Sequence, residues 1–271
     1  MRLDPMAAAA GFRLVVHDVL GSTNSEALTQ SRRGEKGPLW VVAREQTAGR
    51  GRRGREWVSA PGNLYATLFL FDPAPAESAP QLAFVAGLAV YDAIVDCARD
   101  LNEGLALKWP NDVLYANRKL AGILIESEMA AGKLAIAIGI GVNCVRHPAQ
   151  TSFPATDLGE AGKKVSPESL LYALSHAMMR RLDQWHGGAG FASIRIDWLT
   201  CASGVGREIT ARLAGRDLSG HFEGLDEAGR LVLRLADGTL QTITAGDIFP
   251  VVERATVVSL LQRPRQKGQT D

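Results

Sequence analysis

The sequence predicts an α+β protein in two parts, a mixed domain of strands and helices over residues 1–202 and a small β domain over residues 205–255. In the first part, apolar strand-like runs are interspersed with segments whose apolar residues recur at helical spacing. In the second part, short alternating runs are broken by glycine-containing turns, a pattern typical of a small barrel or meander. Residues 256–271 are assigned to a polar tail.

Each element of the first part follows from one of these two patterns. Strands are expected over residues 12–19, 38–45, 62–71, 105–110, 119–129 and 133–144. Helices are expected over residues 22–30, 77–101, 166–185 and 191–202. Either Ser22 or Thr23 can cap the first helix, since Thr23 and Glu26 have capping-box spacing. Ser166 is expected to cap the third helix, with Pro167 at its first position.

Length and composition exclude several classes of protein. A chain of 271 residues buries a core large enough to need no disulfide or metal for stability. Its formal net charge is only +1, so any strong positive field must be local. Cys97, Cys144 and Cys201 lie far apart without CxxC spacing, which favours a reducing cytoplasm over a disulfide framework or zinc site. The amino terminus is a poor signal peptide, and the uninterrupted apolar runs are shorter than the roughly 20 residues that span a membrane.

The stretch TAGRGRRGREW, residues 47–57, concentrates positive charge on a loop. Four arginines alternate with three glycines, and Trp57 ends the stretch. A solvated basic turn would explain the charge alone, but each glycine adds to the entropy lost when the loop orders. Glycines let backbone N–H groups approach an anion, and guanidinium groups bind phosphate or carboxylate oxygens in pairs. A loop that closes around an anion is therefore expected, with an RNA-binding arginine patch as an alternative.

A second group of functional side chains is expected at the end of the strand over residues 105–110. Asn111 and Asp112 follow this strand, and Lys119 opens the next one. A turn explains the first two, and a lysine that reaches to water explains the third. The grouping nevertheless puts a carboxamide, a carboxylate and an ammonium at adjacent strand ends, where a rigid sheet can hold functional groups.

Ser22, Thr23 and Asn24 form a third polar group, at a strand-to-helix turn. Helix capping explains one of them but not all three. Gln46, directly before the arginine-rich stretch, adds an amide at a comparable strand end. Together these side chains can satisfy the donors and acceptors of a neutral polar ligand.

Four stretches carry a specific resemblance. GSTNSEA, EQTAGRGRRGREW, KWPNDVLYANRKLAGILIE and IGIGVN occur in this order between residues 12 and 145. They resemble the defining motifs of the biotin–protein ligases, which activate biotin with ATP and Mg²⁺ and attach it to a lysine of a biotin carboxyl carrier protein, such as that of acetyl-CoA carboxylase. The resemblance implies a catalytic domain like that of class II aminoacyl-tRNA synthetases, followed by an SH3-like β-barrel.

The resemblance also implies a role for each matching residue. Expected to contact biotin are Ser22, Thr23, Asn24, Gln46, Gly49, Arg50, Gly51, Arg52, Lys119, Gly122 and Gly139. Expected to contact ATP are Arg52, Arg55, Trp57, Asn111, Asp112, Lys119 and Asn143. Lys119, Arg52 and Asp112 are the expected catalytic residues, with Asp112 holding the Mg²⁺ that arrives with ATP.

This chemistry calls for fixed cations. A carboxylate and the α-phosphate of ATP repel one another, and charge accumulates on the phosphorus oxygens in the transition state. Cations aimed at those oxygens stabilise it. The product, biotinoyl-AMP, is a mixed anhydride that water destroys, so a loop that orders over it would preserve it.

Other expectations remain open at this stage. A lipoate or octanoate ligase or transferase is the nearest alternative function. The first strand begins near residue 12, which leaves no room for an amino-terminal helix-turn-helix, so a ligase-only form that binds neither DNA nor membrane is expected. It would be a monomer or a homodimer. The five histidines have no persuasive partner in the sequence and are expected to be structural, which leaves Asp112 or the adenylate phosphate as the base for the acceptor lysine.

Overall fold

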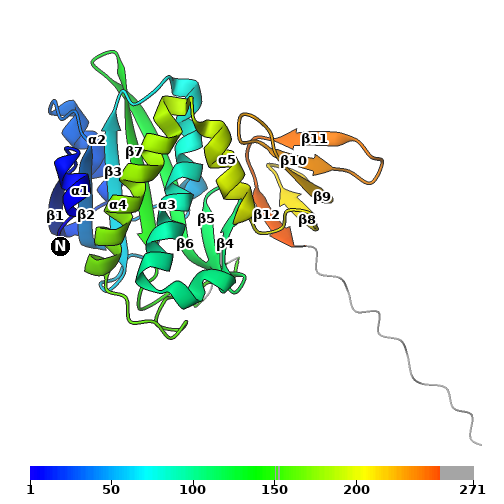
Figure 1. Ribbon diagram of the computed structural model, residues 1–271, viewed down its shortest axis with the longest axis horizontal. Coiled ribbons are helices and arrows are strands. Elements are labelled where there is room, and N and C mark those ends of the chain that lie inside the picture. The colour runs from blue at the N-terminus through cyan, green and yellow to red at the C-terminus, as the bar shows by residue number, and fades with distance from the viewer. Residues whose placement is uncertain (150, 152, 251–271) are drawn as a thin grey trace, which may run out of the picture.

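A computed structural model describes the chain over residues 1–149, 151 and 153–250; the predicted polar tail lies outside this range (Figure 1). The helices are α1 Pro5–Ala9, α2 Thr23–Arg32, α3 Leu82–Cys97, α4 Pro167–Trp185 and α5 Phe191–Thr200, with short 3₁₀ helices η1 Arg52–Gly54, η2 Ala76–Gln81, η3 Arg99–Gly104 and η4 His186–Gly188. The strands are β1 Arg13–Leu20, β2 Leu39–Gln46, β3 Leu64–Phe71, β4 Leu105–Lys108, β5 Asp112–Tyr115, β6 Arg118–Ala130, β7 Lys133–Val142, β8 Glu208–Arg212, β9 Asp217–Leu225, β10 Leu231–Arg234, β11 Leu240–Ile243 and β12 Asp247–Pro250.

The larger sheet has seven strands in the order β1-β2-β3-β7-β6-β5-β4. β1 and β2 are parallel, and the other neighbours are antiparallel, so the sheet is mixed. Successive residues of β2 face opposite sides, as the strand period of two requires. Trp40 and Val42 join the large core with α3 and α4, which lie across one face, whereas Leu39 and Val41 pack with Ala27 of α2 on the other (Figure 1).

One helical run in the described part of the chain, Ala76–Cys97, is long and apolar enough to cross a membrane by length and composition. The sequence alone did not indicate this, because polar residues interrupt the apolar residues of the run. Ten of the sixteen residues of α3 are buried, among them Leu82, Leu88 and Ile94. A helix that is apolar on most sides is typical of the inside of a large core, and α3 lies there, packed against the sheet, α4 and α5.

The smaller sheet is antiparallel and has the strand order β11-β10-β9-β8-β12. Phe222 and Leu233 are fully buried in its core. It lies against the larger part through Trp109, whose indole Nε1 donates to the carbonyl oxygen of Gly229 at 3.2 Å. The predicted α+β class is thus confirmed. The arrangement brings β12, at the end of the described chain, next to the arginine-rich loop of residues 47–57.

Three predictions about local structure are wrong. Residues 112–115, treated as a connection, form β5, because Ala116 and Asn117 adopt φ of 47° and 59° and turn the chain without a glycine. The expected capping box at Thr23 is also absent. Ser22 is the N-cap but its side chain makes no capping bond, and Gln46 Oε1 instead accepts the Thr23 N–H at 2.8 Å. The helix expected over 77–101 is divided into η2, α3 and η3.

Candidate functional site

A cavity of about 390 Å³ lies between the start of α2, the arginine-rich loop, strands β6 and β7, and β12. Every predicted site residue except Gly49 lines it. Those residues are Ser22, Thr23, Asn24, Gln46, Arg50, Gly51, Arg52, Arg55, Trp57, Asn111, Asp112, Lys119, Gly122, Gly139 and Asn143. Side chains that are separated by up to 121 positions in the sequence are thus brought to one cavity. Lys108, Phe153, Asp247 and Phe249 also line it and were not predicted.

One end of the cavity is a network of uncharged polar side chains. Thr67 on β3 is fully buried, and its hydroxyl lies 2.7 Å from both Thr23 Oγ1 and Asn24 Oδ1. Gln46 Oε1 lies 3.1 Å from the Thr23 hydroxyl, and the Asn24 amide donates to Glu126 Oε2 at 2.8 Å. These bonds fix the rotamers of the predicted polar residues. Thr67 was not predicted, because it lies in the middle of an apolar strand.

Three glycines make the floor of the cavity beside this network. Gly139 and Gly141 share a face of β7, and Gly122 of β6 is directly opposite Gly141. A Cβ on Gly139 would lie 2.4 Å from Asn24 Oδ1, and one on Gly141 would lie 2.6 Å from the Trp57 indole. Only residues without a side chain allow these groups to lie directly on the sheet. Trp57 therefore rests on the same floor that Gly122 and Gly139 were expected to provide for biotin.

The arginine-rich loop has a defined shape. Arg50 and Glu56 form an antiparallel bridge, and the Gly51 N–H donates to the Arg55 carbonyl oxygen at 2.7 Å. Arg53, with φ of 57°, makes the reversal between them. Gly49 packs outside the cavity, where a Cβ would lie 2.5 Å from the Trp57 carbonyl oxygen, so its role here is to let the two sides of the loop approach.

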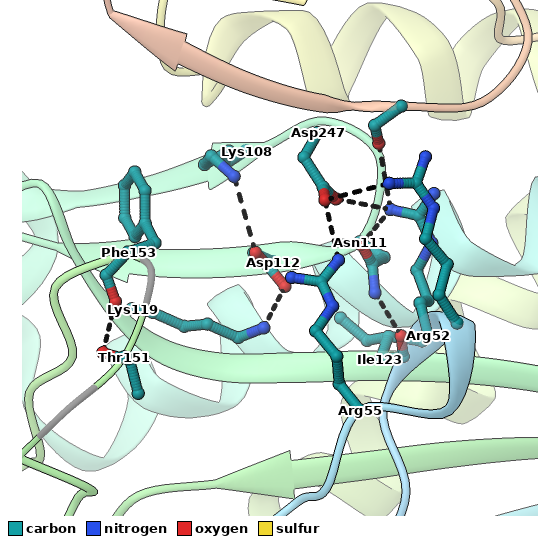
Figure 2. A network of polar contacts seen from close by, with 12 residues as sticks. Arg52, Arg55, Lys108, Asn111, Asp112, Lys119, Ile123, Thr151, Phe153 and Asp247 are labelled. Carbon is teal, nitrogen blue, oxygen red and sulfur yellow. Dashed lines mark hydrogen bonds and ion pairs between the residues drawn. The ribbon is translucent and has the colours of Figure 1, made fainter. Parts of the chain in front are cut away.

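Three arginines of this loop converge on one carboxylate, that of Asp247 at the start of β12 (Figure 2). Arg55 Nη2 lies 2.7 Å from Asp247 Oδ2. The distances from Arg52 Nη1 to Asp247 Oδ1 and from Arg53 Nη1 to Asp247 Oδ2 are longer, at 3.4 Å and 3.5 Å. Arg52 also donates to Asn111 Oδ1 at 3.1 Å. Burial acts to raise the pKa of Asp247, but the hydrogen bond from Arg55 and the arginine charges outweigh it, so this pKa is lowered. Burial lowers the pKa of Arg52.

Two lysines converge on a second carboxylate, that of Asp112 (Figure 2). Lys119 Nζ lies 2.6 Å from Asp112 Oδ1 and Lys108 Nζ lies 3.6 Å from Oδ2, both as ion pairs without hydrogen-bond geometry. Lys108 is only 6% exposed, and its ammonium lies 4.5 Å and 5.6 Å from the ring centroids of Phe153 and Phe249. Burial lowers the pKa of Lys108 more than the Asp112 charge raises it. Lys108 belonged to the KWPND motif, but the sequence did not show that it is enclosed by rings from two distant segments.

The Asp112 and Asn111 side chains are the candidate ligands for Mg²⁺. No cluster of three or more His, Cys, Asp or Glu side chains suited to a metal occurs among residues 1–149, 151 and 153–250. Asp112 Oδ1 is buried and already lies 2.6 Å from the Lys119 ammonium, so a cation there would share this carboxylate with Lys119. A single carboxylate fits Mg²⁺, because this ion keeps several waters and takes its other ligands from substrate phosphates.

Two histidines pair with acidic side chains that are not their neighbours in the sequence. His147 Nδ1 lies 2.7 Å from Asp157 Oδ2, and His176 Nδ1 lies 3.3 Å from Asp4 Oδ1. Neither acidic residue is near its histidine in a recognisable motif, so only the tertiary structure reveals the pairs. Asn143, expected to contact ATP, donates to the Thr156 carbonyl oxygen at 3.0 Å. Thr156 directly precedes Asp157, the partner of His147.

Comparison with known proteins identifies the family of this chain. Residues 17–143 match the biotin/lipoate A/B protein ligase family, and residues 204–249 match the biotin protein ligase C-terminal domain. A biotin--[acetyl-CoA-carboxylase] ligase of Paracoccus denitrificans is 45% identical over 239 residues, which are 84% of this chain and 96% of that protein. The chain belongs to the biotin protein ligase family.

Relatives and solved structures extend this assignment. The bifunctional ligase/repressor BirA of Bacillus subtilis is 32% identical over 247 residues, 88% of this chain and 74% of that protein. A biotin protein ligase from Aquifex aeolicus, solved in complex with biotin and ATP, superposes with a TM-score of 0.73 at 28% identity and covers 88% of this chain and 97% of that one. The two family matches contain Asp112 and Asp247, so these two carboxylates lie in parts of the chain that this family shares.

Proposed function

We propose that this chain activates biotin with ATP to biotinoyl-5′-AMP and then transfers the biotin to a lysine of a biotin carboxyl carrier protein. The observation that carries the proposal is the charge of the cavity. Five basic side chains, Arg50, Arg52, Arg55, Lys108 and Lys119, line it with three carboxylates, those of Glu56, Asp112 and Asp247, which leaves a surplus of two positive charges. Two anionic substrates would use that surplus.

The first half-reaction joins the biotin carboxylate to the α-phosphate and releases pyrophosphate. Lys119 lies on the rigid sheet beside the glycine floor, so it would hold the carboxylate and the α-phosphate together. Lys108, on the neighbouring β4, would add a second charge at the same centre. The arginines would take the outer phosphates, because their planar groups bind pairs of phosphate oxygens. Mg²⁺, held through Asp112, would supply charge neutralisation at the departing pyrophosphate.

The uncharged network and the glycine floor would bind biotin. Thr23, Asn24 and Gln46 offer donors and acceptors that suit a ureido group, and they are pre-organised by Thr67. Biotin entering over Gly122 and Gly139 would displace the Trp57 indole, which would then face the adenine together with Asn143. The loop that carries Arg50, Gly51 and Arg52 would close over the adenylate and exclude water.

The expected acceptor is the carrier domain of a biotin-dependent carboxylase. Asp112 or the adenylate phosphate would accept the proton of the attacking lysine. We also infer action in the cytoplasm, as a monomer or homodimer and without DNA binding. All three cysteines are free, which fits a reducing compartment.

The decisive experiment is biotin-dependent ATP–pyrophosphate exchange by the purified chain. Exchange with biotin but not with lipoate is expected, and Lys119→Ala should lower its rate about 10²- to 10³-fold, the loss typical of removing one electrostatic group from a reacting centre. Lys133→Ala is the matched control, because Lys133 pairs with Asp72 on the surface at 2.6 Å and should not matter. Exchange supported by lipoate alone, or salt-dependent RNA retention without any exchange, would refute the proposal.

A further inference from the structure

The segment of residues 145–157, which follows β7, builds one wall of the cavity. Pro148, Thr151, Phe153 and Ala155 line the cavity from this side. Phe153 packs against the Lys108 ammonium, as Figure 2 shows, and its ring lies 6.2 Å from that of Phe249. The position of this wall therefore affects the centre that holds Asp112.

The beginning of the segment is fixed by one buried side chain. Asn63 Oδ1 accepts the N–H groups of Cys144 at 2.8 Å and Val145 at 3.0 Å, and its amide donates to the Arg146 carbonyl oxygen at 2.8 Å. Asn63 is 4% exposed. These bonds set the direction in which the chain leaves β7. They hold residues 144–146, which precede Pro148, the first residue of the segment that lines the cavity.

The end of the segment is joined to the backbone of Lys119. The Lys119 N–H donates to the Pro154 carbonyl oxygen at 2.7 Å, and the Thr156 N–H donates to the Lys119 carbonyl oxygen at 2.9 Å. Asn143 adds a bond to Thr156. A displacement of residues 154–156 would therefore move both Lys119 and Asn143.

His147 and Asp157 connect the two ends. Asp157 is buried and accepts twice, from the Glu160 N–H at 2.7 Å and from His147 Nδ1 at 2.7 Å. A carboxylate only accepts, so His147 Nδ1 carries a hydrogen in this bond. The side-chain bond joins the two ends of the segment, and the four cavity-lining residues lie between these ends in the sequence.

We propose that His147 is a positioning residue for ATP: its bond to Asp157 holds the wall of Pro148, Thr151, Phe153 and Ala155 against the nucleotide side of the cavity. This inference rests on the proposed function and adds a residue that touches no substrate. The polar network for biotin is formed by Thr23, Asn24, Gln46 and Thr67, on the side of the cavity opposite this wall. None of the hydrogen bonds of the segment described above involves these four residues. Loss of the bond should therefore weaken ATP binding selectively.

The test is a split of Michaelis constants in ATP–pyrophosphate exchange. His147→Ala should raise the KM for ATP about tenfold, the size expected when a hydrogen bond to a charged group is lost, while the KM for biotin stays within about twofold. His147→Asn keeps a donor near the position of Nδ1 and should restore the KM for ATP to within about threefold of the parent. Asp157→Asn should reproduce His147→Ala, and the double variant should add little, because both changes remove one interaction.

His176→Ala is the matched control, since His176 forms a similar pair with Asp4 between α4 and the amino terminus, away from the cavity. It should leave both Michaelis constants unchanged. An unchanged KM for ATP in a folded His147→Ala, or equal increases for ATP and biotin, would overturn the inference. Absence of exchange in the parent chain would instead overturn the proposed function.

Discussion

Two carboxylates of the cavity, those of Asp112 and Asp247, are held in contrasting ways. Asp112, Lys108 and Lys119 belong to neighbouring strands β5, β4 and β6 of one sheet, whereas Asp247 and its arginines join a loop to a separate sheet (Figure 2). The carboxylates of Asp112 and Asp247 are similarly buried, at 13% and 17% side-chain exposure, but Lys108 is 7% exposed whereas Arg53 and Arg55 are 43% and 51% exposed. The lysine centre is thus rigid and poorly solvated, while the arginine centre depends on docking and has its outer arginines open to water.

This contrast separates two tasks. Charges act strongly where water is excluded and geometry is fixed, so the lysine centre should control the rate of the chemical step. Solvent screens the arginine centre, so its pairs contribute less energy but can be broken and re-formed as a loop opens. The arginine centre should therefore control retention of the nucleotide and the adenylate.

The largest expected effect is that of Asp112→Asn. Removing this charge leaves two ammonium groups together without a carboxylate, and it removes the candidate Mg²⁺ ligand. Exchange should fall about 10³-fold, and the free energy of unfolding should fall by about 3 kcal/mol, as for a broken buried pair. Exchange kinetics and urea unfolding measure the two quantities.

Asp72→Asn is the surface counterpart of that change, because Asp72 pairs with Lys133 where both are exposed. It should alter the free energy of unfolding by less than about 1 kcal/mol and leave exchange intact. Similar losses from both variants would remove the distinction between a buried and a solvated carboxylate.

Lys108→Met should separate activity from stability within the lysine centre. Since burial lowers the pKa of Lys108, keeping it charged at neutral pH costs folding free energy. Methionine fits between Phe153 and Phe249, so the free energy of unfolding should stay within about 1 kcal/mol of the parent or rise. Exchange should nevertheless fall about 100-fold. Full exchange activity in this variant would exclude Lys108 from the reacting centre.

Local patterns were sufficient to predict most of the fold. The apolar runs at 38–45 and 62–71 are inner strands of the large sheet, and they are almost continuously apolar because both of their faces are buried. β5 was missed because it has only four residues and its turn uses Ala116 and Asn117 in the left-handed region without glycine. Such a turn is stabilised by the pairing of β5 with β6, which is not visible in the local sequence.

The cavity was predictable only where its residues belong to motifs. Lys119 and Asp112 belong to one motif, so the sequence alone predicted that they lie in the same site. Asp247 lies in an ordinary turn sequence, and it reaches the arginines only because the second sheet docks through Trp109. Likewise, nothing near Trp57 in the sequence indicates that its indole rests on Gly141, 84 positions away. Contacts of this kind depend on tertiary packing.

Arg52→Gly should weaken the arginine centre without abolishing the chemical step. Arg52 links the loop to Asn111, Gly246 and Asp247, so its loss removes the bond to Asn111 of the large sheet and leaves only Arg53 and Arg55 to hold the loop to Asp247. Adenylate should still form, but its dissociation should accelerate about tenfold or more, which gel filtration followed by timed transfer measures. Arg53→Gly is the control, because Arg53 makes one contact at 3.5 Å and already has φ of 57°, which glycine adopts freely. Equal retention by parent and Arg52→Gly would contradict this division of tasks.

The smallest expected effect is that of Asp247→Asn on stability. The pKa of Asp247 is lowered in the folded chain, so its charge stabilises the fold above the ordinary carboxyl pKa, and this stabilisation disappears as pH falls through the folded value. Its arginine partners are partly solvated, so Asp247→Asn should lower the free energy of unfolding by only about 1 kcal/mol at pH 7. In urea unfolding the difference from the parent should shrink steadily as the pH is lowered from about 5 towards 3. A loss at pH 7 as large as that of Asp112→Asn would mean that the arginine centre is as rigid and as poorly solvated as the lysine centre.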